Sequence, residues 1–147
     1  MSTQNLKLVI AMARAYNALF VELGHNIASF GVTVSEFGVL EMLLHKGKQP
    51  VQRIGEKILV TSGTITSVIN KLEKRGYVQR KKCEKDGRVY YVSLTASGSK
   101  FISKIFPQHE IYLDKLVADI DESSKKILTN KLMALQGLLN AKNLNNK

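Results

Sequence analysis

The sequence predicts a mainly helical protein that carries one small β-hairpin. Over most of the chain, apolar residues recur every three or four positions, which is the spacing of amphipathic helices. Strand-like sequence is confined to residues 77–83 and 89–94, which flank a charged tip with the turn-forming pair Asp86-Gly87. Only two of the 147 residues are proline, which suits long helices.

Composition and cysteine content narrow the class of protein. Hydrophobic residues make up 44% of the chain, which is enough for the core of a single domain over residues 1–147 and excludes disorder throughout. One cysteine permits no internal disulfide, and His25, His45 and His109 lack the spacing of metal ligands. Without a signal peptide or an apolar run long enough to span a membrane, the sequence predicts a cytoplasmic protein with no metal and no cofactor.

Two helices are expected in the first third of the chain. Residues 5–30 have the apolar spacing of one long helix, with Gly31 as its stop. A second helix is predicted to start at Thr33, because Thr33 and Glu36 have the spacing of a capping box, in which each side chain bonds the backbone N–H of the other residue. Gly47 is expected to end this second helix.

Two shorter helices follow. Pro50 suits the first position of a helix that ends near Val60, and Thr61 is the expected N-cap of the next helix, which Gly76 terminates. At about 100° per residue, this fourth helix has one apolar side, formed by Ile65, Val68, Ile69 and Leu72. The opposite side presents short polar residues first and lysines behind them: Gly63, Thr66, Ser67, Asn70, Lys71 and Lys74, with Ser62 and Thr64 at the N-terminal end.

Two more helices are expected after the hairpin. The last one begins after Asp121 and leaves a polar tail over residues 141–147 that is expected to fray. The central part, residues 33–95, has the element order of a winged helix-turn-helix. The outer segments, 1–32 and 96–147, carry apolar stripes that so small a central domain has no room to cover. We therefore expect a second copy of the chain to cover them, which makes them dimerisation helices.

The polar side of the fourth helix suits the major groove of duplex DNA. Small hydroxyl and amide groups allow close approach and can bond base edges, while lysines farther along the helix meet phosphates. Free N–H groups at the helix N-terminus also favour phosphate. An ordinary amphipathic surface helix has the same apolar stripe, so the helix taken alone leaves both interpretations open.

The distribution of charge favours the nucleic-acid interpretation. The chain has 22 basic and 12 acidic residues, a formal net charge of +10. Residues 71–88 hold eight bases and three acids, so half of that net charge lies in the end of the fourth helix and the hairpin. Positive charges so concentrated repel one another unless phosphate neutralises them. The expected partner is therefore double-stranded DNA.

The hairpin tip contains residues with separate expected roles. Lys85 adds positive charge, and Arg88 can reach the minor groove, where A·T-rich sequence concentrates negative potential. Asp86 is a poor phosphate contact, but it could hold the Arg88 guanidinium in position. A turn-forming aspartate beside a solvated arginine explains the same spacing.

Several motifs, taken in order, resemble those of the MarR family of transcription regulators. Residues 60–66 and 70–78 are similar to its recognition-helix region, the triplet 86–88 to its wing, and residues 93–98 to its exit from the wing. The resemblance implies an obligate homodimer that regulates transcription, usually as a repressor, from a near-palindromic operator. It also implies that Arg88 enters the minor groove. The residues it places near bases or phosphates are Ser62, Thr64, Thr66, Ser67 and Lys71.

The resemblance extends to a ligand. Residues 36–41 and 106–109 look most like the branch of the family that responds to hydroquinones and related aromatics. The family suggests a pocket between the dimer helices and the DNA-binding lobe, which implies a small aromatic ligand. Five side chains are candidates to line this pocket: Tyr16, Phe20, Phe37, Met42 and Tyr112. Apolar residues at helical spacing are, however, more often ordinary core residues.

Cys83 is a candidate redox sensor because it is the one thiol in the chain. Lys81, Lys82 and Lys85 lie beside it in sequence and would favour the reactive thiolate. Members of the family that sense oxidants or quinones through a cysteine commonly carry it near the N-terminus, where this chain has none. A cysteine at a strand edge is also often incidental.

Other classes of function are less well supported. An enzyme is not expected, because the sequence shows no nucleophile–base pair, no phosphate-cradling glycine loop and no pair of carboxylates at a useful spacing. Membrane-surface binding needs a basic amphipathic helix with exposed apolar residues, whereas the basic cluster lies largely on the hairpin. The remaining alternative is a winged-helix module that binds RNA or protein without operator specificity. Dimerisation and a preference for duplex DNA with an inverted repeat would separate the two.

Overall fold

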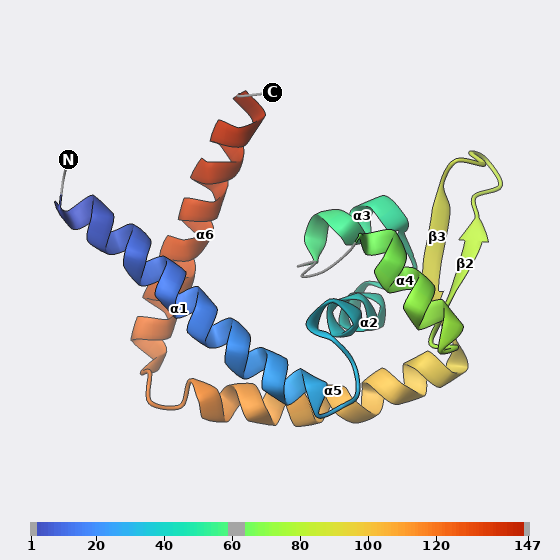
Figure 1. The fold of residues 1–147 in the computed structure, drawn as a ribbon, viewed down its shortest axis with the longest axis horizontal. Coiled ribbons are helices and arrows are strands. Elements are labelled where there is room, and N and C mark those ends of the chain that lie inside the picture. The colour runs from blue at the N-terminus through green and yellow to red at the C-terminus, as the bar shows by residue number, and fades with distance from the viewer. Residues whose placement is uncertain (1–2, 59–63, 146–147) are drawn as a thin grey trace. The chain divides into compact units, whose positions relative to one another are not determined.

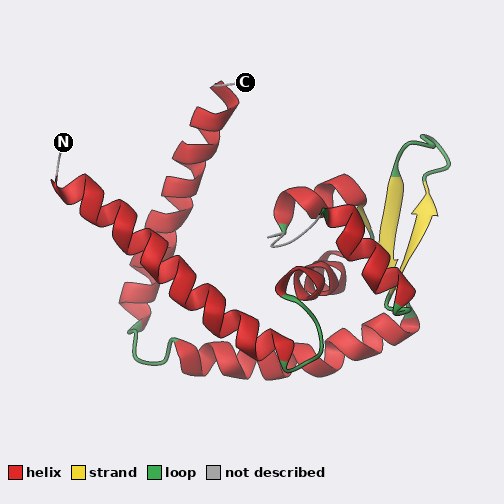
Figure 2. Ribbon diagram, in the orientation of Figure 1, coloured by secondary structure: helices red, strands yellow, loops and turns green. Residues whose placement is uncertain are grey.

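The computed structural model describes residues 3–58 and 64–145. The chain divides into two compact units, Met1–Glu110 and Ile111–Lys147. The first unit contains α1 (Thr3–Ala28), α2 (Val34–Lys46), β1 (Gln49–Pro50), α3 (Val51–Lys57), α4 (Ile65–Lys74), β2 (Val78–Lys82), β3 (Tyr90–Leu94) and most of α5 (Ala96–Leu116) (Figure 1). The second contains the end of α5 and α6 (Glu122–Asn145). The predicted class, mainly helical with a small hairpin, is confirmed (Figure 2).

The local signals at the ends of α2 act as predicted. Thr33 Oγ1 accepts the Glu36 N–H at 3.1 Å, and Glu36 Oε2 accepts the Thr33 N–H at 3.3 Å, which completes a capping box. At the other end, Gly47 is the C-cap, and its φ of 70° lies in the region that glycine adopts without strain. The prediction of this helix from its capping residues is confirmed.

Helix α4 begins later than the sequence predicted. Its N-cap is Thr64, whose Oγ1 accepts the Ser67 N–H at 3.2 Å, and the predicted cap Thr61 lies outside the described residues. The C-terminal end is as predicted, because Gly76 has a φ of +78° and donates its N–H to the Glu73 carbonyl at 2.9 Å. The helix is therefore bounded by two local signals, of which the sequence analysis identified one.

The predicted hairpin is present as β2 and β3, and a third strand, β1, extends it to a three-stranded antiparallel sheet. Its order is β1-β3-β2, with Gln49 opposite Val92 in the strand pair that was missed. The strand escaped prediction because it has two residues and includes Pro50, which a sheet tolerates at its edge. Pro50 is also the N-cap of α3, one position before the predicted place, and α3 ends at Lys57.

The core of the first unit lies beneath the helix-turn-helix. Helix α2 contacts both α4 and β3, and α3 contacts α4, so the three helices pack as one group beside the sheet. The largest fully buried side chains come from α2, α3, α4, both hairpin strands and α5: Val39, Leu40, Ile54, Ile69, Leu72, Val78, Val92 and Ile102. Their burial fixes α4 by its apolar side and leaves its polar side outward.

The outer helices expose much apolar surface. On α1, large apolar side chains are 39–59% exposed: Leu6, Leu8, Val9, Ile10, Tyr16, Leu19 and Val21. None of the residues of α6, all of which the structure describes, is buried. Its exposed apolar side chains are Ile127, Leu128, Leu132, Met133, Leu138, Leu139 and Leu144. The predicted frayed tail from residue 141 is wrong in part, because α6 continues to Asn145.

Within residues 3–58 and 64–145, no helix combines the length and the apolar character that a bilayer span requires.

Candidate nucleic-acid interface

The outward side of α4 carries the residues that the sequence assigned to DNA. Thr66, Asn70, Lys71 and Lys74 are exposed, and Ser67 is half-buried. The opposite side is held in the core by Val68, Ile69 and Leu72. Ser62 and Gly63 lie outside the described residues. The described part of this helix therefore presents hydroxyl and amide groups followed by lysines, as its periodicity predicted.

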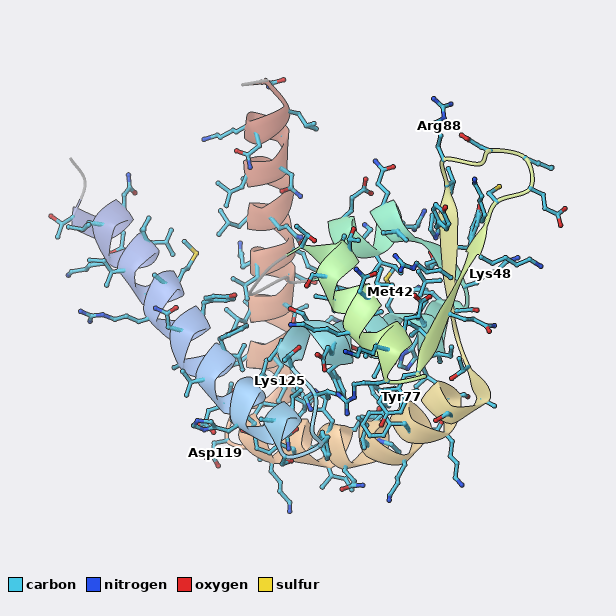
Figure 3. All side chains as sticks on the ribbon, turned by 45° about the vertical axis from the view of Figure 1, so that its right-hand side comes forward. Met42, Lys48, Tyr77, Arg88, Asp119 and Lys125 are labelled. Atoms are coloured by element: carbon cyan, nitrogen blue, oxygen red, sulfur yellow. The ribbon has the colours of Figure 1, made fainter. Side chains whose placement is uncertain are left out.

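The hairpin tip holds Arg88 clear of the protein. The Arg88 side chain is 91% exposed, and Figure 3 shows it pointing away from the ribbon. Asp86 Oδ1 accepts both the Arg88 backbone N–H at 3.0 Å and its Nε at 3.2 Å. Such an exposed ion pair adds little stability. Its effect is to restrict the directions in which the guanidinium extends.

A second ion pair, which the sequence analysis missed, joins the hairpin to α4. Arg80 donates from Nη2 to Glu73 Oε1 at 3.0 Å and from its backbone N–H to Glu73 Oε2 at 3.2 Å. The hydrogen bond from the Arg80 side chain holds the pKa of the Glu73 carboxyl below its usual value. This tie is therefore intact at neutral pH and is lost only as the pH falls through that lowered pKa. It fixes the wing relative to the exposed side of the helix.

A groove of about 440 Å³ connects these features. It brings together side chains from α3, the polar side of α4 and both arms of the hairpin: Pro50, Val51, Gln52, Thr66, Arg80, Arg88, Val89 and Tyr90. Two arginines and a threonine thus line the same concave surface. Gln52 and Tyr90 were not among the predicted site residues, because neither belongs to the periodic stripe of α4 or to the hairpin tip.

A larger cavity, of about 900 Å³, lies in the first unit away from that groove. Of the five predicted ligand residues, Phe37 and Met42 line it. Tyr16 is 50% exposed and stacks on Phe20 with a centroid separation of 5.7 Å, whereas Tyr112 belongs to the second unit. The remaining lining residues are Leu23, Ile27, Val34, Gly38, Glu41, His45, Lys46, Gln49, Arg53, Lys57, Ile58 and His109.

His109 is the buried polar side chain of this cavity. Its Nδ1 lies 2.7 Å from Asn26 Oδ1, and its ring centroid is 4.7 Å from that of Phe37. Burial lowers the pKa of His109 below 6.5, and the charges of Glu41 and Glu110 oppose this effect. Sequence analysis assigned no role to the His109 side chain beyond excluding it as a metal ligand, because no local pattern shows its contact with Asn26, 83 positions earlier.

The lowered pKa of His109 predicts a pH-dependent stability. Below about pH 6.5 the unfolded chain takes up a proton that the folded chain resists, so the free energy of unfolding falls until the folded pKa is reached. We expect His109→Gln, which can still bond Asn26, to lose less stability than the wild type when the pH is lowered from about 7.5 to 5.5. Urea unfolding at both values measures this. His25→Gln, at an exposed position, is the control and should keep the wild-type pH dependence; an equal slope in all three proteins would contradict the prediction.

Cys83 lies at the end of β2 and is half-buried. Its backbone N–H donates to the Val89 carbonyl at 2.8 Å, which continues the hairpin pairing. The neighbouring Lys81, Lys82 and Lys85 are exposed. These contacts do not test the predicted redox role of Cys83, which stays a prediction. Among the described residues, no group of three or more His, Cys, Asp or Glu side chains could hold a metal ion.

Comparison with known proteins agrees with this geometry. The MarR family profile matches residues 32–90, which span α2 to the start of β3. The HTH-type transcriptional regulator MhqR of Bacillus subtilis is 38% identical over 147 residues, which covers the whole of both chains.

Solved structures share the fold. A putative MarR-like transcription regulator from Bacillus cereus superposes with a TM-score of 0.80 at 22% identity, covering 94% of this chain and 99% of the other. Reduced AbfR bound to DNA superposes with a TM-score of 0.68 at 20% identity, covering 92% and 93%. The full-length relative, the matching profile and the exposed helix beside a cationic wing lead to one conclusion: this chain belongs to the MarR family of DNA-binding transcriptional regulators.

Proposed function

We propose that this regulator binds a near-palindromic operator as a homodimer and acts as a ligand- or stress-responsive repressor. The observation that carries the proposal is the groove in which Thr66 from α4 meets Arg80 and Arg88 from the wing. A DNA duplex presents a groove edge and phosphates together, so a concave cationic surface beside a polar helix is complementary to it.

The individual roles follow from exposure and chemistry. Thr66, Ser67 and Asn70 are assigned to base edges in the major groove, and Lys71 and Lys74 to phosphates. Arg88, oriented by Asp86, is assigned to the minor groove, with Lys85 beside it on the backbone. Thr64 already caps α4 with its oxygen, but its hydroxyl proton remains able to bond a phosphate. Ser62 keeps the role that the family resemblance implies.

The homodimer is supported by the exposed apolar surfaces of α1 and α6. Covering them with a second copy removes that area from water, which is the main favourable term in most protein association. A twofold dimer of this kind presents its recognition helices about 34 Å apart, one turn of DNA. We thus propose that the outer segments, 1–32 and 96–147, are dimerisation helices. Residues 33–95 are the DNA-binding lobe, and all three segments belong to a single domain.

The cavity around Phe37, Met42 and His109 is the proposed ligand site, with a small aromatic molecule as the expected class. A ligand that prefers the dimer spacing unable to bind DNA would release the operator, to an extent set by its difference in affinity for the two states. The relatives are named as regulators, which supports a role without catalysis. A regulator of this kind also fits the cytoplasmic location predicted from the sequence.

Selection of bound fragments from a random pool of DNA duplexes tests the proposed function. Recovery of an inverted repeat with half-sites one helical turn apart is the expected result. Recovery of no shared sequence, together with a preference for single-stranded RNA over duplex DNA, would instead support the RNA-binding alternative. The same pool supplies the operator for the measurements below.

Arg88→Ala tests the assignment of the wing. We expect operator affinity to fall about 10- to 100-fold, because a guanidinium in the minor groove is lost, while the dimer remains intact. Fluorescence anisotropy over a range of salt concentrations measures both the affinity and the salt dependence, which should be steep for the wild type. Lys104→Ala removes the same charge from the exposed surface of α5 and serves as the control. Wild-type affinity in Arg88→Ala, or a flat salt response, would remove the wing from the binding surface.

A further inference from the structure

Arg75, the C-cap of α4, connects the recognition helix to the turn between α1 and α2. One guanidinium nitrogen, Nη1, donates to the Gly31 carbonyl at 2.9 Å and to Glu36 Oε2 at 3.3 Å. Gly31 follows α1, and Glu36 lies in the first turn of α2. The end of α4 is therefore joined, through one cationic group, to the α1–α2 turn and to the first turn of α2, which lie about 40 residues earlier in the sequence.

The acceptors of this connection are themselves held in place. The Glu36 side chain is 9% exposed, and its Oε2 also accepts the Thr33 N–H in the capping box. The Arg75 guanidinium carbon lies 5.0 Å from the centroid of Tyr77, which stacks on Phe101 of α5. Tyr77, labelled in Figure 3, lies just before β2. The guanidinium is thus fixed by one ring and two oxygens.

We propose that Arg75 is a positioning residue that sets the orientation of α4 relative to α1, and thereby the spacing between the two recognition helices of the dimer. This inference rests on the proposed homodimer, in which α1 forms part of the interface. The core beneath α4 is apolar, and apolar contact has little directional preference. A planar guanidinium donates its hydrogen bonds in fixed directions. The bonds from Arg75 therefore define an orientation of α4 that apolar contacts alone do not.

The expected effect is on geometry more than on stability. The Arg75 side chain is 39% exposed, and ion pairs at such positions contribute little to the free energy of unfolding. A lysine at this position keeps the charge, but its compact ammonium does not reproduce a guanidinium that lies over the Tyr77 ring and contacts both oxygens. Arg75→Lys therefore separates the geometry of this contact from the positive charge beside the DNA.

The experiment uses the operator recovered from the random duplexes, with the distance between half-sites shortened or lengthened by one base pair. Wild-type protein should bind the original spacing best. In Arg75→Lys we expect the ratio of the affinity for the original spacing to the affinity for the altered spacings to fall about tenfold. The affinity for a single half-site and the thermal midpoint of unfolding should not change. Lys48→Arg exchanges the same two side chains in the opposite sense at an exposed position outside the proposed dimer helices, and it should keep the wild-type ratio.

A second variant breaks the same contact from the other side. Glu36→Gln keeps an acceptor for Thr33 but removes the carboxylate from Arg75, so it should lower the spacing ratio in the same direction. A wild-type protein that shows no spacing preference overturns the proposed homodimer on its operator. A wild-type preference that persists at full strength in both Arg75→Lys and Glu36→Gln leaves the homodimer intact and overturns the role of Arg75.

Discussion

Gly98→Ala should lower the free energy of unfolding by about 3 kcal/mol, the upper end of the range for overpacking a core. A Cβ atom at residue 98 would lie 1.9 Å from the Tyr77 carbonyl oxygen, a backbone atom that has little freedom to move. That carbonyl also accepts the Thr95 N–H at 3.1 Å, and the Tyr77 ring stacks on Phe101 with centroids 4.5 Å apart. To relieve the clash, the start of α5 would have to move away from Tyr77, the residue just before β2.

Chemical denaturation followed by the helical circular dichroism signal measures this loss, at one protein concentration because dimer stability depends on concentration. Gly137→Ala is the matched control. Gly137 lies within α6 and has open space around its missing Cβ, so alanine should leave stability unchanged or raise it slightly through its better helix propensity. Equal unfolding midpoints for Gly98→Ala and the wild type would show that this contact is not constrained as described.

Leu132→Asp should convert the proposed dimer to a monomer without unfolding the chain. Leu132 is 48% exposed on α6, a helix without buried residues along its described length, so its folded unit loses no core contact. In a dimer interface, however, the new carboxylate would be desolvated without a partner, a cost of several kcal/mol. Light scattering coupled to size-exclusion chromatography measures the mass of the particle, and circular dichroism checks that it is folded.

Asn130→Asp adds the same charge on the opposite side of α6 and should remain dimeric. A Leu132→Asp variant with the wild-type mass would exclude this side of α6 from the interface. Loss of the dimer in both variants would point to net charge, and not to burial of Leu132, as the cause.

The sequence predicted the elements whose ends depend on neighbouring residues. The Thr33–Glu36 capping box and the glycines at 47 and 76 act over three or four residues, so their geometry is almost independent of the rest of the fold. The prediction was wrong where tertiary context decided. The edge strand β1 exists only because β3 is beside it. The helical conformation of residues 141–145 has a different cause, because α6 has no buried residue and these positions continue the helix that precedes them.

The candidate site divides in the same way. The polar side of α4 was predicted, because it follows from helical periodicity. The pairing of Asp86 with Arg88 was one of two interpretations that the spacing left open, the other being a turn-forming aspartate beside a solvated arginine. The ties that hold these groups in place were not predicted. Arg80 reaches Glu73 across the end of a helix, and Arg75 reaches Glu36 across 39 positions, so no local spacing reveals either pair.

The chain's own order of residues determined that a polar, lysine-rich helix precedes a basic hairpin, because side-chain periodicity and turn chemistry are properties of short segments. Only the tertiary structure decided that Thr66, Arg80 and Arg88 share one groove, that Phe37 lies beside His109, and that Arg75 joins α4 to the turn between α1 and α2. These contacts arise because burial of the core brings distant segments together, and burial depends on the packing of the whole unit.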